Sequence, residues 1–382
     1  MTKPCTVVII TSSFPTSGDG SEAAGAFVAD FAIELGKLVN VRVVAPGPKK
    51  TKELWCESIE IFRYPTPERP LSTLNPLNPA DAWRIANVMR AGYLATEAAL
   101  DEGCVQHILA LWALPCGEWA RSCAQKYGVN YSVWTLGSDI WSLGRIPIVR
   151  SFLRKVLRNA KHCWSDGLKL AHDTEAIAGR EVHLLPSTRR TSRSRNQPLS
   201  ECPPYSLLFL GRWHPNKGID LLFEAIDLLT ENQWKRIKKI RICGGGPLQR
   251  EVESNIRRLS EAGRPVLLSG FLDRESAEEA IIDADWLLIP SRIESIPVVF
   301  SDAMKLKCPV IATPVGDLPA LLQGKTGGVV AKDLSAKSFH KAMEAALLSS
   351  PYDLSSGIRE LAAQFDISDI AAKVYSSLVT ND

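Results

Sequence analysis

The sequence lacks long apolar runs, paired cysteines and a strong net charge, and each absence narrows what the chain can be. No stretch approaches the roughly 18 apolar residues that a membrane-spanning helix requires. The start, MTKPCTVVIITSSFP, is too short and too strand-like for a signal peptide. The nine cysteines form no Cys-x-x-Cys pair and no Cys/His ligand set, which favours reduced thiols in the cytoplasm over a disulfide framework or a metal centre. The net charge of +3 is too small for a chain built to bind nucleic acid.

The chain is too long for one ordinary core. Its 382 residues favour two domains, and 45% hydrophobic with 23% charged residues is typical of a globular enzyme. Short apolar runs alternate with helical patterns such as AGAFVADFAIELGKL (24–38). Continuous apolar runs indicate strands that are buried on both faces, hence parallel sheets. The clearest runs are residues 6–12, 41–46, 107–111 and 131–137, followed by SLLFLG, IRICGGG, PVLLSGF, WLLIPS and PVIATPVG.

Residues 186–204 interrupt this alternation. PSTRRTSRSRNQPLSECPP is poor in apolar residues and rich in Pro, Ser and Arg, which is typical of a linker, and its arginines (189, 190, 193 and 195) are expected to be solvated. We therefore predict an α/β protein with two Rossmann-like, doubly wound domains that face a deep cleft at the carboxyl ends of their strands. The predicted parts are residues 1–185, a linker over 186–204, residues 205–365, and a helix over 366–382 that packs back toward the first domain.

The segment GRWHPNKGID (211–220) places two cations in a thin loop between a predicted strand and a predicted helix. Gly211 lets the chain turn as it leaves the strand, and Arg212 and Lys217 then lie at the carboxyl end of that strand. A guanidinium, an ammonium and the unpaired N–H groups of a helix N-terminus make a good diphosphate site. The alternative is an ordinary strand-to-helix loop whose two cations are solvated.

The segment PSRIESIPVVFSDAM (290–304) supplies two carboxylates eight residues apart. Glu294 lies in the loop after a predicted strand, Pro297 fits the first turn of the next helix, and Asp302 lies further along that helix. Carboxylates accept hydrogen bonds from hydroxyl groups, so the pair suits a sugar and a ribose. The start of the helix also offers backbone N–H groups to a phosphate. The alternative is a helix-start glutamate with a surface aspartate.

Two further patterns are interpreted as structural. CGGGP (243–247) does not match Gly-x-Gly-x-x-Gly, so it indicates a tight turn after a strand rather than a dinucleotide site. Asp283 and Asp285 precede a predicted strand, at the end opposite the cleft, and are not expected to bind a metal.

Five segments occur in an order and at spacings that resemble a known enzyme family. They are GRWHPNKGID, ICGGGPLQREVE, SGFL, DADWLLIPSRIESIPVVFSDAM and PVIATPVGDLPALL, and together they are similar to the donor-binding domain of GT-B glycosyltransferases of family 4, the group 1 type. The first half agrees through SSFPTSGDGSEAAGAF and TLGSDIW (135–141). The resemblance covers nearly the whole chain. It is specific in residues 206–331 and moderate in residues 1–170.

The resemblance implies a hexosyltransferase-type enzyme of polysaccharide biosynthesis. It would move a sugar, with retention, from a nucleotide-diphosphate sugar held by the second domain to a glycan or lipid-linked acceptor on the first. The donor is a co-substrate, and no cofactor or metal is expected. Arg212 and Lys217 would hold the diphosphate, Glu294 the sugar and Asp302 the ribose. The remaining donor contacts would be Gly25, Gly211, Gly270, Phe271, Leu272, Ile296, Pro297 and Val298, with 270–272 facing the base, while Asp139, as a helix cap or cleft residue, and Trp112 are acceptor-side candidates.

Two departures from the family pattern bear on activity. The second acid of the usual Glu-x7-Glu motif is the shorter Asp302, and Leu109 and Leu111 stand where many relatives carry histidines in a segment like HAHWALPxG. His107 lies two residues earlier. An altered acceptor, a weak enzyme, and a binding or scaffolding subunit without turnover all remain open. An epimerase or a phosphorylase on the same architecture is a further alternative.

Residues 144–164 combine basic and apolar side chains at helical spacing. Such a helix either packs its apolar side on the sheet and solvates its charges, or lies at an anionic bilayer surface. The second interpretation predicts a cytoplasmic protein that is peripheral at the inner face of the membrane. The basic residues are Arg145, Arg150, Arg154, Lys155, Arg158 and Lys161, and the interleaved apolar residues are Ile148, Phe152, Val156 and Leu157.

Overall fold

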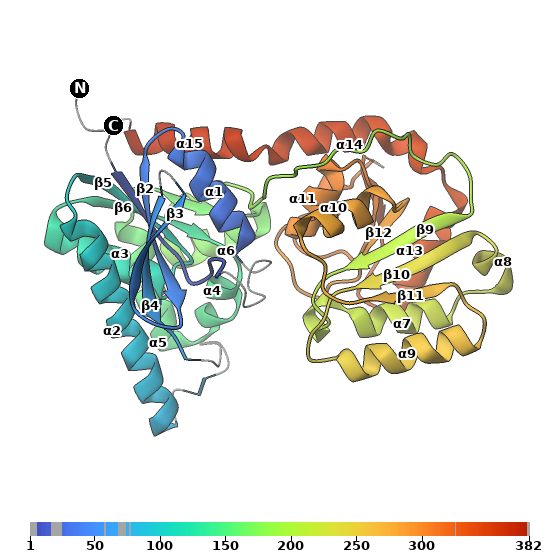
Figure 1. The fold of residues 1–382 in the computed structure, drawn as a ribbon, viewed down its shortest axis with the longest axis horizontal. Coiled ribbons are helices and arrows are strands. Elements are labelled where there is room, and N and C mark those ends of the chain that lie inside the picture. Colours follow the sequence, from blue (N-terminus) through green and yellow to red (C-terminus); the bar gives the residue numbers. More distant parts are fainter. Residues whose placement is uncertain are drawn as a thin grey trace. The chain divides into compact units, whose positions relative to one another are not determined.

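The structure is a computed structural model that describes residues 6–16, 25–56, 59–67, 74–75, 78–324 and 326–379. The chain forms two compact units, which Figure 1 draws as a ribbon. Unit 1 contains residues 1–189 and 367–382, and unit 2 contains residues 190–366. None of the described helices is long and apolar enough to cross a membrane.

The described part of unit 1 is built on one eight-stranded sheet. The strands are β1 (Thr6–Ile10), β2 (Asn40–Gly47), β3 (Thr51–Cys56), β4 (Ile59–Pro65), β5 (Val105–Leu111), β6 (Asn130–Thr135), β7 (Cys163–Ser165) and β8 (His183–Leu184). Their order is β3-β4-β2-β1-β5-β6-β7-β8, and within it β3 pairs antiparallel with β4 while the other described pairs are parallel. Val7 to Ile10 of the central strand β1 are buried on both faces, as a continuous apolar run predicts.

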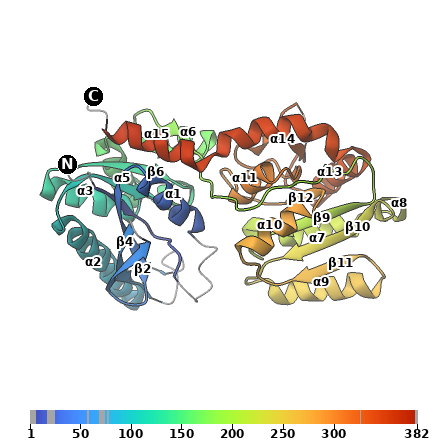
Figure 2. The same ribbon diagram turned by 45° about the horizontal axis from the view of Figure 1, so that its top comes forward.

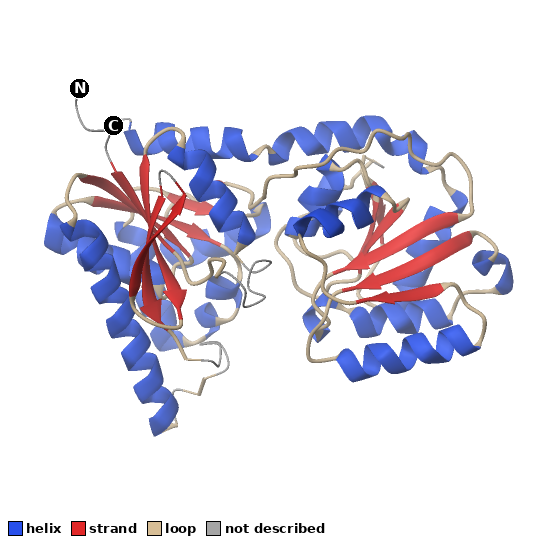
Figure 3. Cartoon of the chain, in the orientation of Figure 1, coloured by secondary structure: helices blue, strands red, loops and turns tan. Residues whose placement is uncertain are grey.

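Helices cover both faces of the unit 1 sheet (Figure 3). They are α1 (Ala26–Gly36), α2 (Pro79–Asp101), α3 (Cys116–Tyr127), α4 (Ser138–Trp141), η3 (Leu143–Arg145), α5 (Pro147–Asn159), α6 (Leu168–Ala178) and α15 (Ile367–Val379). Helices α2, α3, α5 and α6 share one core, which includes Trp119 and Leu157. On the other face α15 packs beside α1, and Val374 shares a core with Phe31 (Figure 2). The core of unit 1 is therefore assembled from two separate stretches of chain.

The described part of unit 2 is built on a six-stranded parallel sheet. The strands are β9 (Tyr205–Leu210), β10 (Ile237–Cys243), β11 (Val266–Ser269), β12 (Trp286–Ile289), β13 (Val310–Ala312) and β14 (Gly328–Val330). Their order is β11-β10-β9-β12-β13-β14. The surrounding helices are η4 (Pro215–Lys217), α7 (Ile219–Asp227), α8 (Glu231–Trp234), α9 (Gln249–Glu261), α10 (Arg274–Ile282), α11 (Val298–Lys305), α12 (Leu318–Leu321), α13 (Ala336–Leu348), η5 (Pro351–Leu354), α14 (Ser355–Ala362) and η6 (Ala363–Phe365).

Both sheets have the doubly wound strand order. In unit 2 the chain builds outward from β9 to β11 and then returns to add β12, β13 and β14 on the other side. In unit 1 it builds from β1 through β2 to β4, then returns to add β5, β6 and β7. This is the order of dinucleotide-binding folds, so the prediction of two Rossmann-like α/β domains is confirmed.

The segment predicted as a solvated linker packs closely on unit 2. The guanidinium of Arg195 is buried and donates to the carbonyl oxygens of Leu306 and Ile281. Arg193 forms ion pairs with Glu275 and Glu279. The prediction of a solvated side chain is therefore wrong for Arg195, whereas Arg193 is exposed. A segment with few apolar side chains can still dock through hydrogen bonds, and composition alone does not reveal this.

Candidate functional site

Strand order indicates where a ligand can approach each sheet. In doubly wound sheets ligands bind at the carboxyl ends of the two central strands whose connections run in opposite directions, the switch point. These strands are β9 and β12 in unit 2, and β1 and β5 in unit 1. Arg212 and Lys217 follow β9 and Glu294 follows β12, while Gly25 lies in the connection after β1 and Trp112 directly follows β5. These five sequence candidates thus lie at a switch point in each unit.

The structure brings a predicted cation and a predicted acid of unit 2 together. The ammonium of Lys217 forms an ion pair with the Glu294 carboxylate, which also accepts a hydrogen bond from Ser291 at 3.1 Å. The Lys217 side chain remains 38% exposed, so an incoming anion can reach it. Arg212 is exposed in the same loop. The loops after β9 and β12 therefore bring the predicted cations Arg212 and Lys217 and the predicted acid Glu294 to one switch point.

A second ion pair joins the same two loops, and the sequence analysis missed it. Arg292 donates to both carboxylate oxygens of Asp220, at 2.7 and 2.8 Å, and its backbone N–H donates to the carbonyl of Asn216. Burial raises the pKa of Asp220, but the hydrogen bonds and charge of Arg292 outweigh it and hold that pKa below its usual value. The sequence did contain a signal for this pair, because Arg292 lies in one candidate segment and Asp220 ends the other. This pair fixes the two loops in register.

The glycine turn CGGGP supports the cationic loop. The N–H of Trp213 donates to Gly245 and the N–H of Gly211 donates to Cys243. A Cβ on Gly244 would lie 2.0 Å from the carbonyl oxygen of Gly211. The turn after β10 therefore has a packing role, as the sequence indicated, because only glycine permits this approach.

Gly218 lies directly after Lys217 and is expected to be intolerant of a side chain. Its φ is 68°, and a Cβ there would lie 1.9 Å from the carbonyl oxygen of Pro290 in the loop that carries Glu294. Gly263 in the same unit has a φ of 72° but open space around it. Gly263→Ala should therefore cost about 1 kcal/mol of backbone strain. Gly218→Ala should lower the free energy of unfolding, measured in urea, by clearly more, and it should also weaken donor binding. An equal loss of stability in the two variants would contradict the close packing of the loops.

Asp302 and the residues just before α11 are buried, in contrast to the exposed Arg212. Asp302 is 1% exposed, and its carboxylate lies 3.7 Å from the ammonium of Lys305. Pro297 is the N-cap of α11 rather than a residue of its first turn, so that detail of the prediction is wrong by one position. Ile296 is buried before it and Val298 begins the helix. The shorter acid thus leaves its carboxylate inside unit 2, while the Glu294 side chain in the loop is 14% exposed.

Residues 270–272 form the loop after β11. Gly270 accepts a hydrogen bond from the N–H of Gly244, which joins this loop to the glycine turn. Phe271 is 67% exposed, and a Cβ on Gly245 would approach its ring at 3.1 Å. Leu272 packs partly on the core of unit 2. The exposed ring is the feature that suits the predicted contact with a base.

The candidates of unit 1 gather at the loops after β1, β5 and β6. Gly25 has a φ of 82° and is the N-cap of α1, and a Cβ there would meet the backbone of Ser13 at 2.7 Å. Trp112 has a φ of 70°, which is unusual for a bulky residue. The backbone N–H of Trp112 donates to the carbonyl oxygen of Trp134. The Trp112 ring meets the Phe27 ring edge-on, with 6.2 Å between the two ring centroids. Backbone strain of this kind persists only where neighbouring groups hold it.

Asp139 is one of the groups that hold the Trp112 turn. Its carboxylate is 1% exposed and accepts hydrogen bonds from the backbone N–H of Ala113 at 2.7 Å and of Leu136 at 3.3 Å. The N-cap of α4 is Gly137, so the helix-cap alternative for Asp139 is wrong. The side chain instead ties the loop after β5 to the loop after β6, which sequence spacing could not reveal because the two loops are brought together only by the sheet.

We expect Asp139 to make unit 1 less stable as the pH rises. Burial raises the pKa of Asp139 to about 6, although its backbone hydrogen bonds lower it. The folded unit therefore favours the protonated form, so this contribution to stability is complete below the unfolded pKa of about 4 and is lost as the pH rises through about 6. Relative to Asp139→Asn, the parent should lose about 2 to 3 kcal/mol between pH 4 and pH 7 in urea unfolding. A constant difference between parent and variant would contradict the assignment.

The two leucines at the family's histidine positions lie in the core. Leu109 and Leu111 are fully buried in β5 and pack on the α1 side of the sheet. His107 is also buried and forms a hydrogen bond with Ser132 at 2.8 Å, and burial lowers its pKa to about 3. His107 is therefore neutral at physiological pH and lies within the strand rather than at its carboxyl end.

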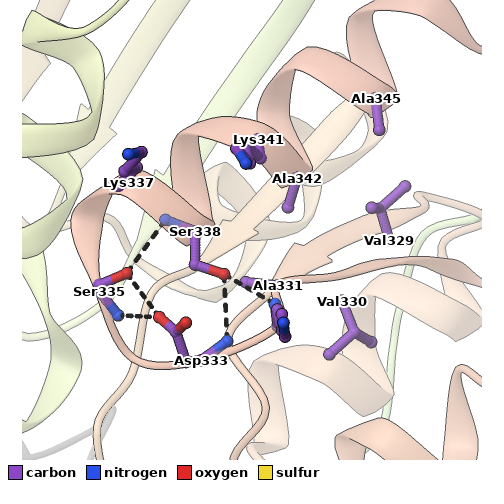
Figure 4. A pocket seen from close by; sticks show the side chains of 11 residues that line it. Val329, Val330, Ala331, Asp333, Ser335, Lys337, Ser338, Lys341, Ala342 and Ala345 are labelled. Carbon is purple, nitrogen blue, oxygen red and sulfur yellow. Dashed lines mark hydrogen bonds between the residues drawn. The ribbon is translucent and has the colours of Figure 1, made fainter.

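A pocket of unit 2 lies apart from these candidates. It has a volume of about 410 Å³ and is formed by β14, the loop that follows it and α13 (Figure 4). Ser335 and Ser338 in its wall serve to cap α13 and to hold Asp333. No predicted donor residue lines it. Across the described ranges, no group of three His, Cys, Asp or Glu side chains is placed to hold a metal ion.

A comparison with protein families identifies the type of domain to which this geometry belongs. Residues 204–349, which include the cationic loop and both acids, match the family of glycosyl transferases group 1. Residues 204–349 of this chain therefore form a domain of the group 1 glycosyltransferase type. The matched segment covers most of unit 2, so the family's domain is the unit that carries Arg212, Lys217 and Glu294.

Curated relatives align with this chain over only part of their length. A D-inositol 3-phosphate glycosyltransferase of Corynebacterium efficiens is 33% identical over 147 residues, 37% of this chain and 34% of the relative. The putative teichuronic acid biosynthesis glycosyltransferase TuaC of Bacillus subtilis is 26% identical over 251 residues, 62% of this chain and 60% of the relative. The alignments with the first relatives thus span only about a third of their length.

Solved structures match this chain over nearly its whole length. Sucrose-phosphate synthase from Thermosynechococcus elongatus has a TM-score of 0.73 at 16% identity and covers 97% of this chain and 98% of its own. Anabaena Alr3699/HepE, solved in complex with UDP-glucose, has a TM-score of 0.68 at 13% identity and covers 98% and 99%. These similarities establish the GT-B fold.

Proposed function

We propose that this protein is a retaining glycosyltransferase that moves a sugar from a nucleotide-diphosphate sugar to a glycan or lipid-linked acceptor. In this reaction the bond between the sugar's anomeric carbon and the diphosphate breaks, the acceptor oxygen bonds to the same face of that carbon, and the acceptor proton is released. The observation that carries the proposal is the meeting of Lys217 and Glu294 at the switch point of unit 2, in the segment that matches the family.

The ion pair suggests how the donor is accepted. A diphosphate carries more negative charge than one carboxylate, so it would compete for the Lys217 ammonium together with the exposed Arg212. Glu294 would then be free to accept hydrogen bonds from sugar hydroxyls, while Ser291 keeps it oriented. As the sugar–phosphate bond breaks, the two cations would stabilise the charge that grows on the leaving diphosphate. Arg292 and Asp220 act on this chemistry only by holding the loops.

The relatives and the solved structures suggest which donors and acceptors to test first. Relatives include an alpha-D-kanosaminyltransferase of Streptomyces kanamyceticus as well as the D-inositol 3-phosphate enzymes, so related domains serve different acceptors. Anabaena Alr3699/HepE was solved with UDP and with UDP-glucose, which makes UDP-sugars the first donors to test. We place the protein in the cytoplasm, because its cysteine pattern suits a reducing compartment.

A thermal-shift screen with UDP-glucose, GDP-mannose and ADP-glucose tests the proposal. A ligand at about 100 times its Kd stabilises the native state by about 2.7 kcal/mol, so the true donor type should raise the unfolding midpoint. The same samples are assayed for slow hydrolysis of the donor without acceptor. Binding with hydrolysis supports the transferase, and binding without hydrolysis supports the binding-subunit alternative, which the buried Leu109 and Leu111 favour. Neither binding nor hydrolysis with any nucleotide sugar would contradict both.

We expect activity to survive chelation. Arg212, Lys217 and the N-terminal end of α7 can neutralise a diphosphate without a divalent cation. Transfer or donor hydrolysis should therefore retain most of its rate after dialysis against EDTA. A complete loss that Mg²⁺ or Mn²⁺ restores would show that a metal shares the charge of the leaving group.

A further inference from the structure

Helix α5 divides its apolar residues between the core and solvent. Leu153, Val156 and Leu157 are buried in unit 1, whereas Ile148 is 74% exposed and Phe152 is 54% exposed. The last two lie one helical turn apart and form a single apolar stripe. The expectation that Ile148 and Phe152 share one packed side with Val156 and Leu157 is therefore wrong, because the core contacts a neighbouring face of the helix, on which Val149 is also partly buried.

The same segment carries positive charge without any acid. From Arg145 to Lys161 there are six Lys and Arg residues and no Asp or Glu. Arg150 and Arg154 donate to the backbone carbonyls of Ala176 and Ile177, contacts that leave their charge in place. Arg145, Lys155 and Arg158 are exposed. On its own helix, the exposed apolar stripe is thus flanked by basic side chains and by no acid.

We propose that the start of α5 binds the surface of an anionic bilayer. Ile148 and Phe152 would enter the interfacial region, while the basic side chains contact lipid phosphates. A second copy of this chain is a poorer occupant, since pairing the face with itself would bring like charges together. The inference rests on the proposed function in one respect: a lipid-linked acceptor would lie at this same surface.

Co-sedimentation of the full chain with vesicles tests this proposal. We expect the protein to bind vesicles of equal parts phosphatidylglycerol and phosphatidylcholine, and to remain in the supernatant with phosphatidylcholine alone. Each basic residue near an anionic surface contributes about fivefold to partitioning, so Arg145→Gln/Lys155→Gln/Arg158→Gln should weaken binding by about a hundredfold. Ile148→Ser/Phe152→Ser should weaken it at least tenfold, as expected when two apolar side chains no longer enter the interface. Leu348→Ser, at a 69% exposed position of α13 in unit 2, is the matched control and should bind like the parent.

Three outcomes would overturn the proposal. The first is a parent protein that does not bind anionic vesicles, and the second is binding that neither α5 variant weakens. The third is sedimentation of the parent as a dimer that Ile148→Ser/Phe152→Ser dissociates, which would make the face a contact between copies. Donor hydrolysis in solution is measured in parallel and should be unchanged in Ile148→Ser/Phe152→Ser. If the parent binds vesicles but does not hydrolyse the donor, the result would instead count against the proposed function alone.

Discussion

Replacing Lys217 with alanine should lower turnover by about 10²- to 10³-fold, because removing one preorganised partner of a developing negative charge costs about 3 to 4 kcal/mol in the barrier. The ammonium lies at the switch point beside Glu294, where the leaving diphosphate would gain charge. Arg212→Ala should lower turnover by a factor of the same order. The rate of transfer or donor hydrolysis at saturating donor is the measurement, with the thermal midpoint as a check on folding.

Lys238→Ala provides the matched control for Lys217→Ala. Lys238 is an exposed lysine near the start of β10, at the opposite end of the strands from the candidate site. Its replacement should leave the rate unchanged. If Lys217→Ala and Arg212→Ala are folded and as active as Lys238→Ala, the two cations do not stabilise the leaving group and the interpretation as a solvated loop is correct.

The second large effect is expected at Glu294. Glu294→Gln keeps the shape of the side chain but removes the charge that orients Lys217, and it weakens hydrogen bonds that tighten as the sugar becomes positively charged. We expect kcat to fall by at least about tenfold, which corresponds to 1.4 kcal/mol, with a small change in the KM for donor. Asp302→Asn should instead raise the KM for donor, since the ribose does not change during transfer.

A double-mutant cycle separates the roles of Lys217 and Glu294. The two side chains are in direct contact, so their effects should not add, and Lys217→Ala/Glu294→Gln should be less impaired than the sum of the single variants predicts. Strict additivity would mean that the ion pair plays no part in presenting the cations. An unchanged kcat in Glu294→Gln would show that this carboxylate does not meet the transferred sugar.

The local patterns of the sequence predicted the strands and the candidate loops. Which loops contact one another depends on the strand order in the sheet, which these patterns do not give. Apolar runs such as TVVII and YSLLFL identify central strands because buried parallel strands leave no polar face. Motifs after β9 and β12 identify Lys217 and Glu294. Their ion pair follows only when the strand order places these two strands side by side. The Arg292–Asp220 pair has the same origin, 72 residues apart in sequence.

Where prediction failed, the missing information was tertiary. Nothing in the arginine-rich segment distinguishes Arg195, whose guanidinium is buried against backbone carbonyls, from a solvated arginine. Helical periodicity places Ile148 and Phe152 on the same helix as Leu157 but does not say where the packed face of α5 ends. Asp139 could be read as a cap from its position, yet its partner Ala113 lies 26 residues away in sequence.

The assembly of unit 1 from two stretches of chain has a consequence for synthesis on the ribosome. Helix α15 contributes Ile370 and Val374 to the same core as Val28 and Phe31 of α1. Those residues emerge only after the whole of unit 2 has been made. During translation unit 2 is therefore able to complete its core first, while unit 1 leaves one face of its sheet partly uncovered. The nascent first half would be the part of this protein that depends most on chaperones.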